Sequence, residues 1–214
     1  IGVGKMGMAH LNVLKNFKLN SIAAWAPSDR AKLDLESLEV DFFEINLRDT
    51  IKKLNPSHVI ISSPVETLFE TTIEAITCGV KNILVEKPMI LNVRQAKSLI
   101  DIKNKYNINI KVAYNRRFYS SLQAALHLIA KSKETIQSIY FEFNEIYPFK
   151  DGPNNKDECV KKKWLLVNSM HVIDLAFVSV GLPLFSKSNF NCKDHDLNWH
   201  PTGSIFYGSG LSEM

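Results

Sequence analysis

The chain has 214 residues, of which 45% are hydrophobic and 22% charged, a composition that excludes intrinsic disorder and can form one large or two small domains. Its apolar runs are strand-sized and far shorter than the roughly 20 residues of a membrane-spanning helix, so we expect no membrane partner. The formal net charge of +4 comes from scattered lysines, and the cluster Lys161–Lys163 lacks interleaved aromatic residues, which argues against a nucleic-acid partner.

The chain opens on a glycine motif of the form G-x-G-x-x-G. The motif follows the apolar Ile1 and precedes apolar residues at helical spacing: Met6, Ala9, Val13 and Phe17. Such glycines form a tight turn that lets a pyrophosphate approach the backbone at a helix N-terminus. The motif alone is a weak signal, but the alternating segments after it are the context that it requires. The predicted cofactor-binding residues of this turn are Gly2, Gly4, Lys5, Met6 and Gly7.

Strand-like and helix-like segments then alternate as far as residue 113. Strands are expected at residues 22–25, 58–62, 83–85 and 108–113. One helix between them is marked by Phe69, Ile73, Ile76 and Val80, with Gly79 as its C-terminal signal, and another by Val93, Ala96 and Ile100. The alternation predicts an α/β fold with a parallel sheet and crossover helices, typical of a Rossmann-type domain.

The pattern changes from about Tyr119. A helix is expected to about Lys133, followed by an antiparallel strand at 139–146 and a loop at 150–155. We predict a Rossmann domain at 1–118 and an α/β domain with a largely antiparallel open sheet at 119–214. Both ends are expected to be truncated: a full strand, about five residues, should precede the glycine turn, and the second sheet should continue past the last residue.

The residues after the second strand bear on the choice between NAD and NADP. Ala26 stands about 20 positions after the glycine motif, where an acidic residue would hold the ribose 2′-hydroxyl. Ser28 and Arg30 follow and can bind a 2′-phosphate, so the sequence favours NADP. In the alternative interpretation, Asp29 or a backbone group holds the ribose and Arg30 is only a solvated helix residue.

The tripeptide Glu86-Lys87-Pro88 directly follows the apolar run 82–85. It places a lysine at the carboxyl end of a strand in a parallel sheet, where ligands bind. An ammonium group is disfavoured beside an oxidised, cationic nicotinamide, so it can share or relay a proton while hydride moves at carbon. In the alternative interpretation, Glu86 and Lys87 form a surface ion pair.

Five segments together resemble the Gfo/Idh/MocA family of NAD(P)-dependent oxidoreductases, whose namesakes act on sugars and inositol. The segments stand in the family's order: Gly2–Gly7, Ser62–Pro64, Val85–Pro88, Tyr114–Phe118 and His171-x-x-Asp174. The resemblance implies hydride transfer between NAD(P) and a hydroxyl or carbonyl carbon of a sugar, polyol or nucleotide-linked sugar. It also implies a homo-oligomer formed through the C-terminal sheet. The competing hypothesis is a catalytically inactive NAD(P)-binding regulator or scaffold.

The resemblance also assigns roles to residues of the first half. Lys87 would lie beside the nicotinamide and hydrogen-bond the reacting oxygen, while Glu86 would orient the lysine or the neighbouring loops. Leu68 stands where many relatives have a histidine, which leaves a polar contact there in doubt. The cofactor would further be lined by Ser62, Ser63 and Pro64.

In the second half, Asn115 and Arg116 match positions that face the substrate cleft, whereas Arg117 is as easily structural. Many relatives carry D-x-x-x-H on a helix, with the histidine as acid–base partner of the lysine. Here His171 is present but Val167 replaces the acid, and Asn168 is a polar residue that can share the helix face with His171. His171 therefore acts alone in catalysis, donates a hydrogen bond to substrate, or is structural.

The remaining metal and thiol candidates are weak. Cys78, Cys159 and Cys192 are widely spaced and form no C-x-x-C motif, which is typical of reduced thiols in a cytoplasmic protein. His195 and His200 lie near two aspartates, but their spacing is not that of a metal site. We therefore expect no metal.

Overall fold

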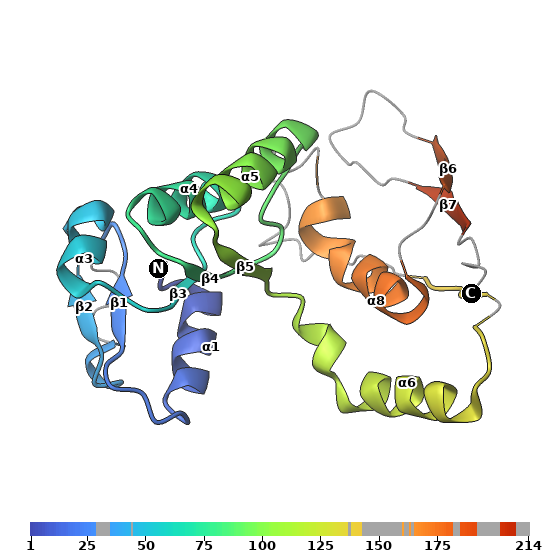
Figure 1. Cartoon of the computed structure of the whole chain (residues 1–214), viewed down its shortest axis with the longest axis horizontal. Coiled ribbons are helices and arrows are strands. Elements are labelled where there is room, and N and C mark those ends of the chain that lie inside the picture. The colour runs from blue at the N-terminus through green and yellow to red at the C-terminus, as the bar shows by residue number, and fades with distance from the viewer. Residues whose placement is uncertain are drawn as a thin grey trace. The chain divides into compact units, whose positions relative to one another are not determined.

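The structure of the chain is a computed structural model, shown in Figure 1. It describes residues 1–28, 35–43, 45–136, 138–142, 160, 163, 165–181, 185–191 and 202–208. The chain divides into two compact units, Ile1–Ala113 and Tyr114–Met214. The domain division after residue 118 stays a prediction, and each unit is described by itself below.

The strands of the first unit are all parallel. β1 (Ala23–Trp25) pairs with β2 (Asp41–Phe43), while β3 (Val59–Ile61), β4 (Asn82–Val85) and β5 (Asn109–Val112) form a sheet in that order. These are the elements of a Rossmann-type parallel sheet, as the sequence predicts. The observed strands lie at the expected places, and each end differs from the expected one by at most one residue. β2 is an additional strand that sequence patterns did not locate.

Helices pack on both faces of this sheet. In Figure 1, α1 (Lys5–Leu14) lies on one face of β3–β5, and α4 (Leu68–Thr77) and α5 (Val93–Tyr106) lie on the other. The main core lies between β3–β5 and the helices α3 (Leu47–Leu54), α4 and α5. Gly79 ends α4 as expected, because its φ of 97° is in the left-handed region and its N–H donates to Ile76 O at 2.9 Å.

Two of the expected apolar helix faces are wrong. In α1 the buried residues are Gly7 and Leu11, whereas Met6 and Val13 are exposed, and Phe17 is exposed and lies beyond the end of the helix. In α5 the exposed residues include Val93 and Ile100, and the side chains that pack on the core are Leu99, Ile102 and Tyr106. Apolar periodicity predicts a helix, but it cannot choose between two apolar faces when small residues such as Gly7 allow the closest packing.

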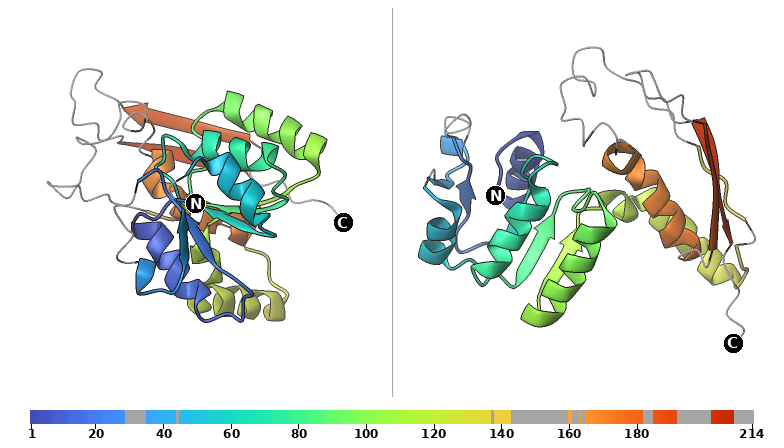
Figure 2. Two further views of the ribbon diagram at one scale, coloured as in Figure 1. Left: turned by 90° about the vertical axis from the view of Figure 1, so that its left-hand side faces the viewer. Right: turned by 90° about the horizontal axis from the view of Figure 1, so that it is seen from above.

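The second unit begins with η1 (Asn115–Phe118) and α6 (Ser120–Ser132). A π-helical turn, η3 (Leu165–Ser169), leads into α8 (Met170–Val180), and β6 (Phe185–Asn191) pairs antiparallel with β7 (Thr202–Gly208), as Figure 2 shows. The strand expected at 139–146 is wrong for residues 139–142, which are irregular. An alternating pattern of apolar and polar residues suits a strand with one buried face, but a strand also needs a hydrogen-bonded neighbour. Residues 143–146 and 150–155 lie outside the described residues.

Candidate functional site

The glycine turn is built by close backbone packing. Gly2 has φ +88°, and a Cβ on it would lie 2.7 Å from the backbone of Ser62. A Cβ on Gly7 would lie 2.0 Å from Gly2 O, so neither position accepts a larger residue. A Cβ on Gly4 would meet nothing within 4 Å, and Gly4 begins α1 without a side-chain cap. The backbone at the N-terminus of α1 is therefore open to an approaching group, the geometry of an anion site.

The serines after β3 brace this turn. Ser62 Oγ donates to Gly2 O at 2.8 Å and to Ile1 O at 3.3 Å, while Ser62 N–H donates to Ile1 O at 2.8 Å. Ser63 Oγ donates to Thr71 Oγ1 on α4 at 3.4 Å, and Pro64 is exposed. These contacts give Ser62 a structural role in shaping the glycine turn, in addition to the predicted contact with a cofactor.

The residues after β3, β4 and β5 meet at one edge of the sheet. Ile61 pairs with Val85, and Val85 pairs with Val112, so the three strands end in register. Lys87 follows β4 at this edge and is half-buried, and the Lys87–Pro88 peptide bond is cis. This is the edge at which parallel sheets bind ligands.

Glu86 is only 8% exposed and contacts a histidine that sequence reasoning missed. His10 Nε2 on α1 lies 2.7 Å from Glu86 Oε1. The interpretation of Glu86 and Lys87 as a surface ion pair is therefore wrong for Glu86, whose carboxylate is buried and contacts α1. One signal was present in the sequence: His10 follows Gly7 by one helical turn, so it shares the face that packs on the sheet.

The candidate ribose site is described in part. Ala26 is buried at 5% exposure directly after β1, and its N–H donates to Phe43 O at 3.4 Å. Ser28 is exposed, and Arg30 lies outside the described residues. The small buried side chain at Ala26 supplies no carboxylate, so the sequence argument for a 2′-phosphate stays a prediction.

The candidate substrate residues of the second unit lie on η1, η3 and α8. His171 is half-buried near the start of α8, and its ring is nearly perpendicular to that of Tyr114, with ring centroids 5.9 Å apart. Asn168 is exposed on η3, whereas Val167 is buried. The structure therefore brings His171 together with Tyr114, a residue to which sequence reasoning gave no role.

Arg117 is a structural residue of this unit. Its Nε donates to Asp174 Oδ2 at 2.7 Å, and its Nη2 donates to Asp174 Oδ1. These two hydrogen bonds connect η1 to α8. Arg117 also lies over the Tyr114 ring, 5.6 Å from its centroid. On the same short helix, Asn115 is exposed and Arg116 is half-buried.

Burial and neighbouring charges shift the pKa values of Tyr114 and Arg117. Burial raises the pKa of the Tyr114 phenol, the Asp174 carboxylate raises it further, and Arg117 opposes both. The hydrogen bond to Asp174 raises the pKa of the Arg117 guanidinium. Tyr114 therefore stays neutral and Arg117 stays charged at physiological pH.

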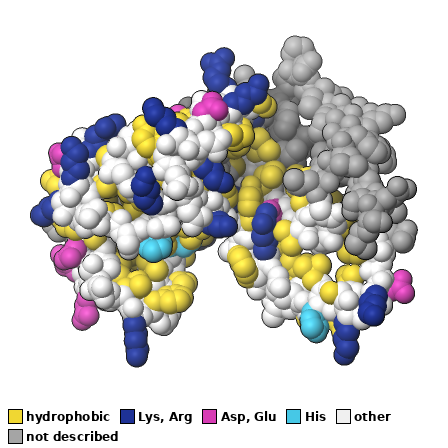
Figure 3. All heavy atoms as spheres, viewed as in Figure 1, with side chains coloured by type: hydrophobic (Ala, Val, Ile, Leu, Met, Phe, Trp, Pro, Cys, Tyr) yellow, Lys and Arg dark blue, Asp and Glu magenta, His cyan; other side chains and the backbone are white. Residues whose placement is uncertain are grey.

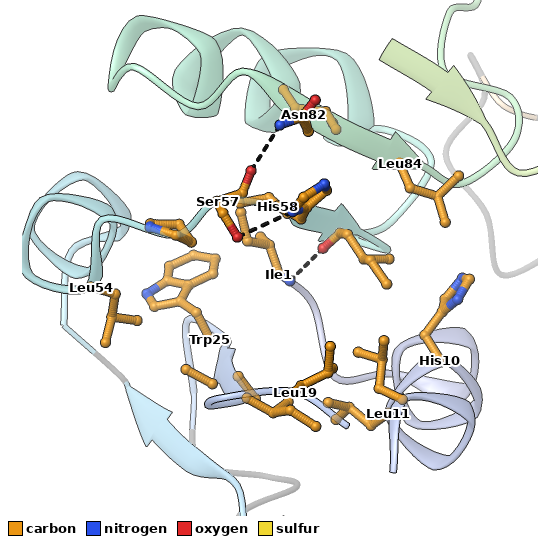
Figure 4. Close-up of a pocket in the computed structure, with 18 of the residues that line it drawn as sticks. Ile1, His10, Leu11, Leu19, Trp25, Leu54, Ser57, His58, Asn82 and Leu84 are labelled. Carbon is orange, nitrogen blue, oxygen red and sulfur yellow. Dashed lines mark hydrogen bonds between the residues drawn. The ribbon is translucent and has the colours of Figure 1, made fainter. Parts of the chain in front are cut away.

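A cleft of about 1110 Å³ with mainly apolar walls lies between α1, β1 and β3 (Figure 4). It reaches the glycine turn, because Gly2, Gly7 and Ser62 are among its lining residues. It is lined by Trp25, Leu11 and Leu84, and by residues such as His58 and Asn82 at the amino ends of the strands. Ligands of parallel sheets bind at the carboxyl ends. The part of the cleft at the amino ends of the strands is therefore not where a ligand is expected, and the candidate dinucleotide site is the glycine turn with the edge that carries Lys87.

The described residues contain no cluster of three or more His, Cys, Asp or Glu side chains that could hold a metal ion. Within the same residues, no helix is long and apolar enough to cross a membrane. On the face of the first unit that Figure 3 shows, the Lys and Arg side chains are scattered rather than gathered in a single patch. His195 and His200 lie outside the described part of the chain.

The fold and the glycine turn are those of a dinucleotide-binding domain. Residues 1–114 match the family model described as an oxidoreductase family with an NAD-binding Rossmann fold. The chain belongs to this Gfo/Idh/MocA family.

Similar proteins agree with that assignment. The rhizopine catabolism protein MocA of Rhizobium meliloti is 28% identical over 124 residues, which are 58% of this chain and 38% of that protein. The structure resembles myo-inositol 2-dehydrogenase from Lactobacillus plantarum, with a TM-score of 0.69, 23% identity, and coverage of 88% of this chain and 57% of that one. It also resembles the WlbA dehydrogenase from Thermus thermophilus, solved with NAD and UDP-GlcNAcA, with a TM-score of 0.68, 17% identity, and coverage of 87% and 63%. The chain thus spans less than two thirds of each of these proteins.

Proposed function

We propose that the protein is a cytoplasmic enzyme that transfers a hydride between NAD(P) and a hydroxyl or carbonyl carbon of a sugar, polyol or nucleotide-linked sugar. The observation that carries this proposal is that the glycine turn and Lys87 lie at the same edge of the sheet. Ser62 contacts Gly2 at the end of β3, and Glu86 contacts α1 at the end of β4. A dinucleotide bound at α1 would therefore have a lysine on the adjacent strand end.

The residues present fit a dinucleotide. The open backbone at Gly4 admits a pyrophosphate, and Lys5 and Met6 supply the first N–H groups of α1. Gly2 and Gly7 hold the turn in the shape that this approach needs, because both positions exclude a side chain. When it is bound, the nicotinamide supplies the carbon that accepts or donates hydride.

We assign the proton chemistry to Lys87. Its ammonium would donate a hydrogen bond to the reacting oxygen of the substrate and would relay the proton that this oxygen loses or gains. The buried neighbours Glu86, Pro88 and Met89 hold its backbone, so the lysine starts from a fixed position. Ser63 and Pro64 would line the cofactor from the neighbouring strand end.

We assign substrate binding to the second unit. Asn115, Arg116, Asn168 and His171 supply hydrogen-bonding groups of the kind that hydroxyl-rich substrates need. The His171 ring lies beside Tyr114, and the position one helical turn before it is the apolar, buried Val167. Its proposed main role is therefore to hold substrate, with proton transfer as a secondary role.

For the cofactor, we propose that NADP is accepted at least as well as NAD. Ala26 adds no negative charge at the end of β1, and Ser28 and Arg30 follow it in the sequence. A 2′-phosphate would meet a hydroxyl and a cation there instead of a carboxylate.

The choice of substrate class rests on the similar proteins. One of them is a myo-inositol dehydrogenase, and another is solved with a nucleotide-linked sugar acid. A polyol or a nucleotide-linked sugar is therefore the first class to test.

A second candidate function is NAD(P)-dependent regulation without turnover. The observation that favours it is the buried apolar Val167, one helical turn before His171, where an acidic partner would tune the imidazole. The geometry of the glycine turn suits both functions, so cofactor binding alone does not separate them.

One experiment separates the two functions. The purified protein is titrated calorimetrically with NADH and NADPH, and the absorbance of reduced nicotinamide is then followed with a panel of polyols, sugars and nucleotide-linked sugars. The enzyme proposal expects binding and turnover of at least one substrate. Binding without turnover across the panel favours the regulator, and the absence of cofactor binding contradicts both.

We also propose that the protein forms a homo-oligomer through the sheet that contains β6 and β7. An antiparallel pair has an outer edge at each strand, and such edges readily pair with another chain. Light scattering with size-exclusion chromatography tests this, and a monomer at micromolar concentration contradicts it.

A further inference from the structure

The contact between His10 and Glu86 joins two parts of the first unit that are 76 residues apart in sequence. His10 projects from α1, the helix whose N-terminus adjoins the glycine turn, toward the side of Leu84 (Figure 4). Glu86 comes directly after β4 and directly before Lys87. The distance of 2.7 Å between Nε2 and Oε1 is that of a strong hydrogen bond.

The environment makes this hydrogen bond costly to lose. The side chains of His10 and Glu86 are 22% and 11% exposed. Water could therefore do little to replace the hydrogen bond if either partner were removed. A buried carboxylate needs a donor, and among the described contacts His10 is the side chain that supplies one. The Glu86 N–H also donates to Ile61 O at 2.8 Å, which fixes the backbone of Glu86 to β3.

We propose that His10 is a positioning residue: by holding Glu86 it fixes the segment that carries Lys87 relative to α1. This inference rests on the proposed function, because α1 is there the helix that receives the pyrophosphate. A dinucleotide held at the glycine turn and a lysine held at the end of β4 then share one rigid frame. His10 itself touches neither the cofactor nor the substrate in this role.

The test measures hydrogen–deuterium exchange of the peptide that covers residues 86–91. His10→Leu removes the donor and leaves the Glu86 carboxylate buried, so exchange of this peptide should rise by about tenfold, the scale of one lost buried hydrogen bond. His10→Gln has an amide donor of similar reach and should restore exchange close to the wild-type rate. Asn12→Leu adds the same side chain on an exposed face of α1 and should change nothing.

Adding NADH separates this inference from the proposed function. In the wild type, NADH should protect both the glycine-turn peptide and residues 86–91. In His10→Leu the turn should still be protected, while protection of 86–91 should be lost or strongly reduced. If neither NADH nor NADPH protects any peptide of the wild type, the proposed function fails, and the ligand-free comparison still tests the contact.

Two outcomes overturn the inference. One is unchanged ligand-free exchange of residues 86–91 in a folded His10→Leu variant. The other is a His10→Gln variant that exchanges as fast as His10→Leu. Should His10→Leu fail to fold, His10→Asn serves in its place, because its amide is too short to reach Glu86 and adds no apolar group.

Discussion

Arg117 holds the buried carboxylate of Asp174 through both oxygens, across 57 residues of sequence. Asp174 is 4% exposed on α8, and Arg117 lies on the short helix η1 that also carries Asn115 and Arg116. The ion pair therefore determines where the candidate substrate residues of η1 lie relative to His171 on the same unit. Removing one partner of such an ion pair lowers stability strongly, because the charge of the other partner stays buried without compensation.

The first prediction is that Arg117→Ala lowers the free energy of unfolding by about 1–3 kcal/mol. This loss of stability is smaller than that expected for a fully buried ion pair, because the arginine side chain is 44% exposed. Urea denaturation measures the change, with Lys131→Ala on the exposed face of α6 as control. Equal stability of the two variants contradicts a structural role for Arg117.

The second prediction concerns the pH dependence of stability. Because burial raises the Tyr114 pKa above the ordinary tyrosine value of about 10, the unfolded chain loses this phenolic proton first as pH rises. The contribution of Tyr114 is complete below about pH 10 and is lost as pH rises through the higher folded pKa. The unfolding free energy of the wild type should therefore fall more steeply with alkaline pH than that of Tyr114→Phe.

Parallel denaturation series at pH values from about 9 to 11 provide the measurement. Asp174→Asn supplies an additional check, since it removes the carboxylate that raises the Tyr114 pKa while burial still acts. Identical slopes for the wild type and Tyr114→Phe would show that Tyr114 ionises equally easily in both states.

Much of the first unit was predictable, because its signals are local. The glycine turn, the strands around β4 and the Glu86-Lys87-Pro88 segment each follow from a few adjacent residues. β2 was missed since Asp41–Phe43 begins with a charged residue and, unlike β1 and β3, has no buried residue. His10–Glu86 and Arg117–Asp174 were missed for another reason: each joins residues 76 or 57 positions apart, and such contacts depend on how whole elements pack.

The third prediction concerns cofactor choice. Ala26→Asp should shift the preference toward NAD, because a carboxylate at the end of β1 binds the ribose 2′-hydroxyl and repels a 2′-phosphate. Calorimetric titration with NADH and NADPH gives both affinities, and a change of about tenfold in their ratio is expected. Ala26 is buried, so Ala26→Ser is the control for the added volume. A wild type that strongly prefers NADH contradicts the proposed acceptance of NADP.

The fourth prediction separates Lys87 from His171. Lys87→Ala should lower turnover by about two to four powers of ten, the usual contribution of a positioned acid–base group, while cofactor affinity stays nearly unchanged. Lys87→Met, which keeps the length of the side chain, should behave in the same way. His171→Ala should cost less and should mainly raise KM, because no carboxylate at Val167 tunes the imidazole for proton transfer.

Steady-state kinetics on the best substrate of the panel, with calorimetry for cofactor binding, rank the two residues. Tyr114→Leu provides a matched test of the imidazole, since the Tyr114 ring lies against His171 and its removal should raise KM in the same direction as His171→Ala. If Lys87→Ala retains normal turnover, the proposed proton relay is wrong at its central residue. The hypothesis of a cofactor-binding regulator, with Lys87 as a residue that only lines the nucleotide, then explains the site better.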